Sequence, residues 1–296
     1  MLVVEAVQRF LTNIEMVRRL SLATVASYKN DLYIFLKYLS SCGITTVDKI
    51  TREIVVEFII QQQTLNPLKA ATIRRRGHAL MSFFKFCFSM GYIRVSPMTG
   101  VQLPKKEKIV PKGLADEEYA RFRDKQIWSR TKPWLGIMEK AICDLLSYLA
   151  PRFDEVRSAL ITDLDFERNK ILIHGKGRKE RLLPMHPVLV ESLRKYLGVR
   201  PKVKCDYLFV SADGRGRLGK NGLYYLFRKQ LKRCGIGSPG VTPHKLRHTL
   251  ALWVLRKTNN DLLSVQKILG HESIETTARY LQCTDERLKQ AIDNAF

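Results

Sequence analysis

The chain has 296 residues, 45% of them hydrophobic, which is enough apolar material for one large or two ordinary domain cores. Its 51 Lys and Arg residues exceed its 28 Asp and Glu residues, and the formal net charge of +23 predicts attraction to a polyanion, with a generally basic solvated surface as the alternative. No stretch approaches the roughly 18 uninterrupted apolar residues of a membrane span, and the first residues lack the pattern of a secretory signal, so we expect a cytoplasmic protein without a membrane segment.

The six cysteines are scattered and form no Cys-x-x-Cys pair. This pattern is typical of reduced thiols and predicts neither a disulfide framework nor a zinc site. His244 and His248 are four residues apart, but Lys245 follows His244 where a zinc protease has Glu. We therefore expect no metal and no cofactor.

The first hundred residues show the three- and four-residue spacing of apolar side chains that is typical of helices. One helix is predicted between Ser21, a suitable N-cap, and Gly43, a suitable stop signal. Two more are predicted at about 51–63 and 69–90, with an Asn-Pro pair breaking the chain between them. This pattern predicts an all-α helical bundle.

Three consecutive arginines, Arg74, Arg75 and Arg76, are expected on the exposed side of the third predicted helix, opposite its apolar face. They would form a surface for a phosphate backbone, and an ordinary solvated face is the alternative. The segment 95–113 is rich in Pro, Gly and Lys and lacks apolar periodicity. We interpret it as an interdomain linker, so that the helical bundle comprises residues 1–94.

Residues 114–296 carry a mixed pattern that predicts an α-rich α+β domain with a small antiparallel sheet. Residues 170–185 alternate in the manner of strands around Gly175-Lys176-Gly177, which indicates a hairpin, and a further short strand is expected at Tyr207–Val210. Helices are expected near 115–127, 134–149, 187–197, 221–234 and 261–268, and also after Thr242-Pro243 and after Ser273.

Residues suited to phosphate chemistry gather near the C-terminus. Thr242 can cap a helix whose first turn displays His244, and Arg247 lies three residues on, on the same face. A His and an Arg at the positive N-terminus of a helix make an anion-binding surface. His271 follows a glycine turn, and Tyr280 comes nine residues later. Taken singly, Tyr280 is more often a packed aromatic than a reactive group.

The pattern becomes specific when Arg152, just past an apolar helix, and Lys176, at the tip of the predicted hairpin, are added. The order Arg, Lys, His-x-x-Arg, His, Tyr resembles that of the tyrosine recombinase (phage integrase) family. With only about 110 residues before the catalytic domain, the arrangement is similar to the two-domain Xer type. The resemblance extends to the first domain, which looks like the family's SAM-like core-binding domain at Thr24, Tyr28, Asp31, Leu32, Phe35 and Leu39.

The resemblance implies site-specific cutting and rejoining of DNA, without metal or ATP. Arg152 and Arg247 would clamp the scissile phosphate, since a guanidinium donates in a planar fork and keeps its charge. Lys176 would be the general acid that protonates the leaving 5′ oxygen. Lys179, three residues further on, is the alternative acid, although the family's Gly-Lys-Gly tip matches Lys176.

The resemblance gives the remaining residues supporting and nucleophilic roles. His244 would assist proton transfer, and His271 would donate a hydrogen bond to a non-bridging oxygen. Glu155 would be an accessory carboxylate that orients neighbouring groups. Tyr280 would be the nucleophile that forms a 3′-phosphotyrosyl bond, and nearby cations would have to favour its phenolate because a free tyrosine has a pKa near 10.

Two positions depart from the family pattern without removing a catalytic group. Ala150-Pro151 stands where the family commonly has Gly-Leu before the first arginine, and Asp154 replaces a usual Ser. The proline is expected to alter how Arg152 is presented.

The resemblance also implies the partners: double-stranded DNA with inverted half-sites, and three further copies of the chain in a tetramer on DNA. The helix near 221–234 resembles the family's second DNA-reading helix. The residues predicted to bind DNA are Arg74, Arg75, Arg76, Lys220, Arg228 and Lys232.

Two other functions compete with this interpretation. One is a DNA-binding regulator that keeps the fold without cleaving. The other is an ATPase, because residues 214–220 fit the G-x-x-x-x-G-K pattern between a predicted strand and a helix. A nucleotide-binding P-loop needs Ser or Thr at the next position to hold magnesium, and this chain has Asn221.

Overall fold

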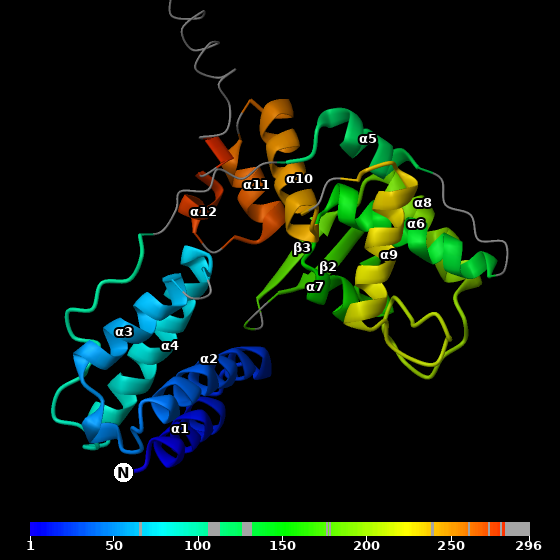
Figure 1. Cartoon of the computed structure of the whole chain (residues 1–296). Coiled ribbons are helices and arrows are strands. Elements are labelled where there is room, and N and C mark those ends of the chain that lie inside the picture. The colour runs from blue at the N-terminus through cyan, green and yellow to red at the C-terminus, as the bar shows by residue number, and fades with distance from the viewer. Residues whose placement is uncertain are drawn as a thin grey trace, which may run out of the picture. The chain divides into compact units, whose positions relative to one another are not determined.

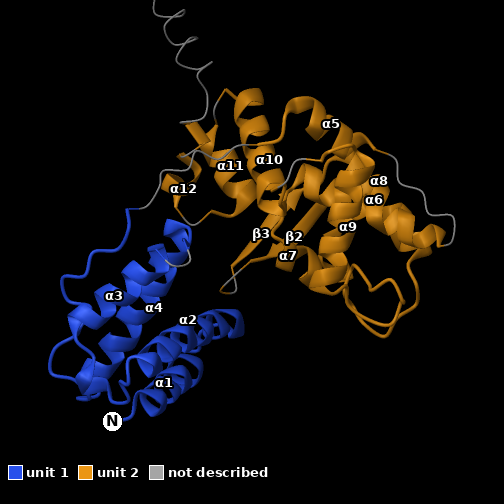
Figure 2. Cartoon of the chain, viewed as in Figure 1, with its two compact units in different colours: residues 1–109 blue, residues 110–296 orange. Residues whose placement is uncertain are grey.

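The structure is a computed structural model that describes residues 1–64, 67–105, 113–125, 132–175, 177, 179–237, 240–259, 261–271, 273–278 and 280–281. The chain divides into two compact units, unit 1 comprising Met1–Ile109 and unit 2 comprising Val110–Phe296 (Figure 2). Each unit has its own buried core, so the fold is described one unit at a time.

Unit 1 is helical, as predicted (Figure 1). The Ser21 hydroxyl accepts a hydrogen bond from the Thr24 N–H at 3.2 Å, which confirms the predicted N-cap, and Gly43 beyond the helix end has a left-handed φ of 71°. The first helix was not singled out from the sequence. The helices of unit 1 are α1 (Val3–Thr12), continued by a π-helical turn at Asn13–Val17, α2 (Leu22–Ser41), α3 (Arg52–Thr64) and α4 (Ala70–Ser89).

Phenylalanines from all four helices fill the core of unit 1. The rings of Phe35 and Phe58 lie 5.0 Å apart between centroids, edge to face, and Phe10 meets Phe83 in the same way at 5.8 Å. Such pairs add a specific geometry to the burial of apolar area. This packing makes unit 1 a compact helical bundle.

The beginning of the predicted linker packs onto unit 1. Met98 and Val101 are buried in the same core as the phenylalanines, and the Leu103 side chain lies against Gly77 of α4. These residues lack periodicity because they contact the core from an irregular segment, not from a helix. The described part of segment 95–113 up to residue 105 therefore belongs to unit 1.

Unit 2 combines helices with one small sheet, which confirms the predicted α-rich mixed architecture. The predicted helices are all present, with ends that differ by a few residues. Its helices are α5 (Asp116–Asp124), α6 (Pro133–Tyr148), α7 (Phe153–Ser158), α8 (Pro187–Val199), α9 (Lys220–Arg233), α10 (Pro243–Lys257), α11 (Leu262–Leu269) and α12 (Ile274–Ala278).

The sheet consists of β1 (Leu164–Asp165), β2 (Lys170–His174) and β3 (Glu180–Pro184), paired antiparallel in that order. The β2–β3 pair is the predicted hairpin. His174 opposite Glu180 is the last register pair before the turn.

The strand predicted at Tyr207–Val210 is wrong. Isolated bridges join Leu160 to Tyr207 and Val210 to Arg217, and no ladder forms among these described residues. The segment is apolar because residues 208–210 are fully buried in the core. A short buried segment has the same apolar sequence pattern whether or not it forms a strand. The Arg200 guanidinium takes over part of the hydrogen bonding, donating to the Tyr207 carbonyl at 2.8 Å.

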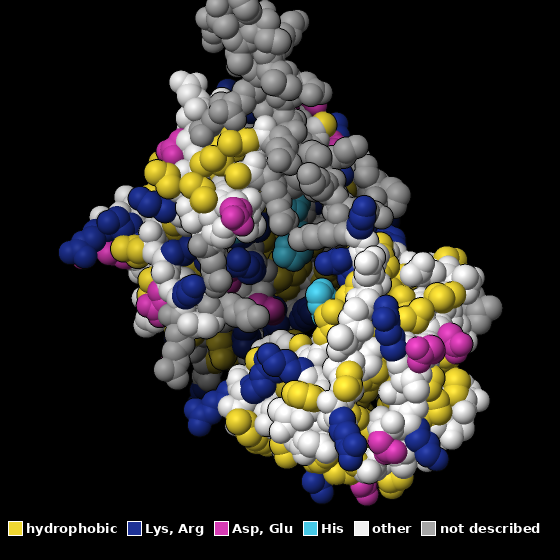
Figure 3. All heavy atoms as spheres, turned by 90° about the vertical axis from the view of Figure 1, so that its left-hand side faces the viewer, with side chains coloured by type: hydrophobic (Ala, Val, Ile, Leu, Met, Phe, Trp, Pro, Cys, Tyr) yellow, Lys and Arg dark blue, Asp and Glu magenta, His cyan; other side chains and the backbone are white. Residues whose placement is uncertain are grey.

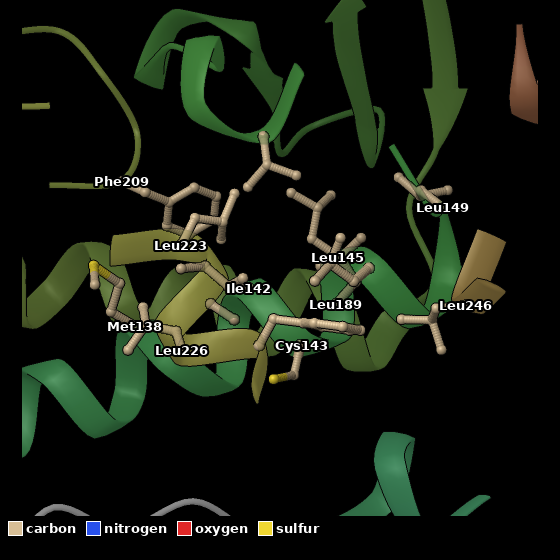
Figure 4. Packing of buried hydrophobic residues seen from close by; sticks show 14 of the residues in the cluster. Met138, Ile142, Cys143, Leu145, Leu149, Leu189, Phe209, Leu223, Leu226 and Leu246 are labelled. Atoms are coloured by element: carbon tan, nitrogen blue, oxygen red, sulfur yellow. The ribbon is translucent and has the colours of Figure 1, made fainter. Parts of the chain in front are cut away.

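Two hydrophobic clusters hold unit 2 together. The larger one packs α6 against α8, α9 and the sheet, with Ile142 and Leu145 of α6 in its middle (Figure 4). The smaller cluster joins α10 and α11, and it includes Ala150 and Tyr280. The predicted catalytic residues Arg152, Arg247 and His271 each lie two or three positions in sequence from a residue of this smaller cluster.

Candidate active site

The first turn of α7 fixes Arg152 by means of a buried carboxylate. Arg152 is the N-cap residue of this helix, and its backbone N–H donates to Glu155 Oε2 at 2.8 Å. Its guanidinium also donates to Glu155 Oε1 at 2.8 Å, while 40% of the Arg152 side chain stays exposed. Glu155 therefore holds Arg152 while leaving part of its side chain exposed.

Arg181 on β3 is a site residue that the sequence analysis missed. Its Nη1 and Nη2 donate to the two Glu155 oxygens at 3.1 and 2.7 Å, and its Nε donates to the Ile268 carbonyl at 3.2 Å. One side chain thus joins the sheet, α7 and the end of α11, which precedes His271. The only signal in the sequence is an arginine in the strand that follows the hairpin tip.

The two arginines decide the ionisation of Glu155. Burial by itself would raise the pKa of this carboxyl group, but the hydrogen bonds and charge of Arg181, together with those of Arg152, outweigh it and lower the pKa below its usual value. Glu155 is therefore an anion at neutral pH.

Arg247 on α10 is buried and anchors two backbone segments. Its Nη1 donates to the Ala150 carbonyl at 2.7 Å, and its Nη2 donates to the Leu269 carbonyl. Burial, reinforced by the charges of Arg152 and Arg181, lowers the pKa of Arg247 to about 10. Arg247 still carries its charge at neutral pH, in a position where that charge acts on Tyr280.

Ala150 adopts a left-handed backbone conformation with φ of 43°. This region favours glycine, so Ala150 adopts a conformation that a glycine would adopt with less strain. The conformation accompanies the hydrogen bond from Arg247 to the Ala150 carbonyl.

His271 follows the glycine turn at the end of α11, as predicted, and its ring lies beside Tyr280. Gly270 has φ of 61°, and the His271 Nδ1 is 2.9 Å from the Thr277 hydroxyl. The rings of His271 and Tyr280 stack at 6.3 Å between centroids with only 6° between their planes. Burial and the nearby arginines, Arg247 first, lower the pKa of His271 to about 4, so its imidazole is neutral.

Tyr280 is buried, and its hydroxyl contacts His248, a residue to which the sequence analysis gives no role in the site. The side chain is 3% exposed, and its hydroxyl oxygen lies 2.6 Å from the Nδ1 of His248. Tyr280 therefore packs into the smaller cluster and at the same time presents its hydroxyl to polar groups. A packed ring and an available hydroxyl are therefore compatible in Tyr280.

The remaining predicted catalytic residues are His244 and Lys176. His244 is exposed in the first turn of α10, where the Thr242 hydroxyl accepts the Lys245 N–H at 3.3 Å and so caps the helix as predicted. Lys176 lies outside the described residues. Next to it, the Gly175 N–H donates to the Lys179 carbonyl at 2.7 Å and closes the hairpin.

The electrostatics of the cluster favour an anion. Arg152 and Arg181 contact the carboxylate of Glu155, and the guanidinium of Arg247 lies close enough for its charge to interact with the same carboxylate. The neighbouring histidines are neutral, because burial lowers the pKa values of both His248 and His271. A positive site with fixed donors suits the charge that spreads over a phosphoryl group during transfer.

Both units of the chain are similar in sequence to known protein families. The Phage integrase family model matches residues 125–287, and the model of the phage integrase N-terminal SAM-like domain matches residues 7–91. The tyrosine recombinase XerC of Oceanobacillus iheyensis is 31% identical over 291 residues, which cover 96% of this chain and 93% of that protein. The chain belongs to the phage integrase family. It is a Xer-like tyrosine recombinase, an enzyme of site-specific DNA recombination.

Solved structures show the same fold. A XerH site-specific recombinase bound to its palindromic difH substrate matches this recombinase with a TM-score of 0.78 at 24% identity, over 97% of this chain and 84% of that one. A lambda integrase tetramer bound to a Holliday junction matches with a TM-score of 0.73 at 16% identity, over 95% of this chain and 77% of that one.

The arginines of α4 make contacts within unit 1 of the recombinase. Arg75 pairs with the buried Asp31, whose second oxygen is 3.6 Å from the Arg76 Nε. Arg76 also bonds Gln62 and is only 14% exposed, so the expectation that it lies on an exposed face is wrong. Arg74 donates to the Pro104 carbonyl at 2.6 Å. The buried Asp31 carboxylate on α2 pairs with Arg75 and Arg76, and sequence spacing does not reveal this contact.

The basic residues of α9 divide into two groups. Lys229 and Arg233 pair with the buried Glu139 of α6 at 2.8 and 2.6 Å. The three residues predicted to bind DNA are instead exposed on the recombinase surface: Lys220, Arg228 and Lys232. On the face shown in Figure 3, Lys and Arg side chains occur all over the described surface, with Asp and Glu between them.

The structure gives the P-loop pattern a different use. In the described part of the chain the element before residues 214–220 is the helix α8, so no strand leads directly into the pattern. Arg217 donates to the Arg157 carbonyl at 2.8 Å and lies over the Tyr207 ring. In the described part of the chain there is also no grouping of His, Cys, Asp or Glu that could hold a metal ion, and no helix is long and apolar enough to cross a bilayer.

Proposed function

We propose that this recombinase cuts a DNA strand by attack of the Tyr280 hydroxyl on a backbone phosphorus. The attack leaves a 3′-phosphotyrosyl bond and a free 5′ hydroxyl. The observation that carries the proposal is the position of Tyr280: its hydroxyl is held in a site whose three guanidiniums make it positive, and the charge of Arg247 acts on it.

The arginines bind the phosphate and stabilise the transition state. Arg152 is partly exposed and already oriented by Glu155, so a phosphate oxygen meets a prepared donor. Arg247 is the second clamp, and His271 donates to a non-bridging oxygen. Glu155 and Arg181 hold this arrangement before DNA arrives, so little of the binding energy is lost in ordering it.

Lys176 protonates the leaving 5′ oxygen, and His244 assists from the first turn of α10. The phosphotyrosyl bond keeps the energy of the phosphodiester, so a 5′ hydroxyl of another strand can reverse the reaction without ATP. Exchange between two sites follows when the attacking hydroxyl comes from the partner DNA.

The recombinase acts on double-stranded DNA sites with inverted half-sites, as a tetramer that brings two sites together. Two observations support this part of the proposal: the exposed cations of α9, and the likeness of the fold to recombinases solved on a palindromic substrate and as a tetramer on a Holliday junction. Lys220, Arg228 and Lys232 contact the DNA from unit 2, and Arg75 is the most open arginine of the three on α4.

The test uses a nicked suicide substrate built on a site recovered by selection from random DNA. A nick near the cleavage point lets the short 5′ fragment diffuse away, so an active enzyme is trapped as a covalent adduct. We expect adduct with the wild type and none with Y280F, which keeps the ring in the cluster and removes only the oxygen. Adduct formation by Y280F would overturn the proposal, and binding without adduct by the wild type would favour the regulator.

A further inference from the structure

His248 contacts the reacting oxygen of the proposed nucleophile. Its Nδ1 lies 2.6 Å from the Tyr280 hydroxyl, and the two rings are tilted by 56° with 5.5 Å between centroids. This distance is typical of a strong hydrogen bond between a phenol and a ring nitrogen. The tyrosine has a single O–H proton, so the hydrogen bond is donated by Tyr280 when Nδ1 is unprotonated.

The surroundings keep His248 in the form that accepts this proton. Among the described residues, the titratable and charged groups that face it are His244 and Arg247 on its own helix, and Tyr280 and His271 from the other side. Burial first, and then the charges of His244 and Arg247, lower the pKa of His248 below its usual 6.5. The imidazole is therefore neutral at neutral pH and has a lone pair to offer.

We propose that His248 is the general base of strand cleavage, which removes the proton of Tyr280 as its oxygen attacks phosphorus. The inference rests on the proposed function and adds a residue to it. The O–H bond of Tyr280 breaks and its proton moves to Nδ1. The oxygen forms a bond to phosphorus, the bond from phosphorus to the 5′ oxygen breaks, and that oxygen takes a proton from Lys176. Rejoining runs the same transfers backwards.

The geometry favours His248 over the other two histidines of the site. His271 lies parallel to the Tyr280 ring and presents its face, while its Nδ1 is occupied by Thr277. His244 is exposed one helical turn before His248, where a phosphate oxygen can reach it. The three histidines thus have separate tasks, and proton removal belongs to the one whose nitrogen points at the hydroxyl.

The experiment compares wild type, H248N, K176A and Y280F on the suicide substrate under single-turnover conditions. Asparagine is the matched variant because its side-chain oxygen occupies the place of Nδ1 and accepts the hydrogen bond but not the proton. We expect H248N to bind DNA like the wild type and to form adduct about 100-fold or more slowly. A rate within a few-fold of the wild type would overturn the proposal. A faster rate would also overturn it, because His248 would then hold the Tyr280 hydroxyl back from attack.

A second substrate separates the base from the acid. When sulfur replaces the bridging 5′ oxygen, the leaving group is a thiolate that needs no proton. The sulfur substrate should restore the rate of K176A and leave H248N slow, whereas rescue of H248N would contradict the assignment. Loss of adduct with Y280F on both substrates keeps the proposed function standing whatever H248N does.

The pH profile of the wild type tests the proposal even if H248N folds poorly. Protonated His248 cannot accept, so the cleavage rate should fall as pH drops through a pKa below 6.5, on the oxygen and the sulfur substrate alike. In H248N this acidic limb should vanish. A wild-type rate on the sulfur substrate that shows no fall on the acidic side of pH 6.5, down to the lowest pH at which the enzyme stays folded, would overturn the proposal.

Discussion

Arg181 links three elements of the site, and nothing in the sequence around it predicts these contacts. It forms a two-point ion pair with Glu155 and also holds the Ile268 carbonyl, so it connects the residue that orients Arg152 with the loop that presents His271. Arg181 is separated from Glu155 by 26 positions in the chain. A lysine cannot reproduce this planar fork, because its ammonium group is a point charge.

We predict that R181K cleaves the suicide substrate about 10- to 100-fold more slowly than the wild type, since a small misplacement of Arg152 and His271 is costly. DNA affinity should change little, because the side chain is largely buried at 13% exposure. Covalent-adduct rates and gel-shift titrations measure the two quantities. R181A should in addition lower the free energy of unfolding by about 3 kcal/mol, since it leaves a buried carboxylate short of a partner. Unchanged cleavage by R181K would show that Arg181 has no positioning role.

At the scale of elements, the three strands are tied together by His174 on β2. Its Nε2 lies 2.7 Å from Asp163 just before β1, and its Nδ1 lies 2.9 Å from Glu180 on β3. The hydrogen bond to Asp163, followed by the charges of both carboxylates, raises the pKa of His174 above its usual 6.5 despite some desolvation. The imidazolium form thus fastens the end of the hairpin next to the turn that carries Lys176.

The sign of the pH dependence follows from that raised pKa. The stabilisation is fully present below pH 6.5, the value for the unfolded chain, and it is lost as pH rises through the higher pKa of the folded state. We predict that wild type exceeds H174N in stability most clearly near pH 5.5, by about 1 kcal/mol or less because the pair is partly solvent-screened, and that the difference shrinks by pH 8.5. Thermal unfolding at both pH values measures it. Equal differences at the two pH values would contradict the ionic contribution.

Most helices of this chain were predictable because their signals are local, whereas α1 and the short α7 were not predicted. Ser21 caps α2 and Thr242 caps α10 through residues three positions away, and the apolar spacing of each helix lies within the helix itself. The Tyr207–Val210 segment failed because burial alone made it look like a strand. Irregular residues such as Met98 gave no signal, since their core contacts come from another part of the chain.

At the scale of the whole molecule, the net charge of +23 predicts binding to DNA that weakens steeply with salt. The structure decides which cations contribute. Lys232 is exposed on α9, whereas Arg76 is engaged with Asp31 and Gln62 inside unit 1. Removal of Arg76 would therefore weaken unit 1 itself, and any loss of DNA binding would mix folding with contact.

We predict that K232A weakens DNA binding several-fold and lowers the slope of log affinity against log salt by about 1, as expected for the loss of one phosphate contact. K195A is the matched control: it removes one charge from α8, where Lys195 is 66% exposed and pairs with Glu191 in a surface bridge. Gel-shift titrations at several salt concentrations compare the two variants. Equal slopes for both would mean that only total charge matters and that α9 has no particular contact.

The sequence by itself determined the class of this protein. Arg152, His244, Arg247, His271 and Tyr280 stand in the order of the family, and neither their identity nor their helical setting needs the tertiary structure. The order of residues along a chain survives without packing, as do cap and periodicity signals between close neighbours.

Only the tertiary structure decided what these residues touch. Tyr280 meets His248 across 32 positions of sequence, Glu155 meets Arg181 across 26, and Arg76 turns inward to Asp31. Such contacts depend on how separate helices and strands pack, and neither residue of a pair carries a local mark of its partner. The sequence therefore determines which chemical groups are present at this site, and the packing of α7, β3, α10 and α11 determines their geometry.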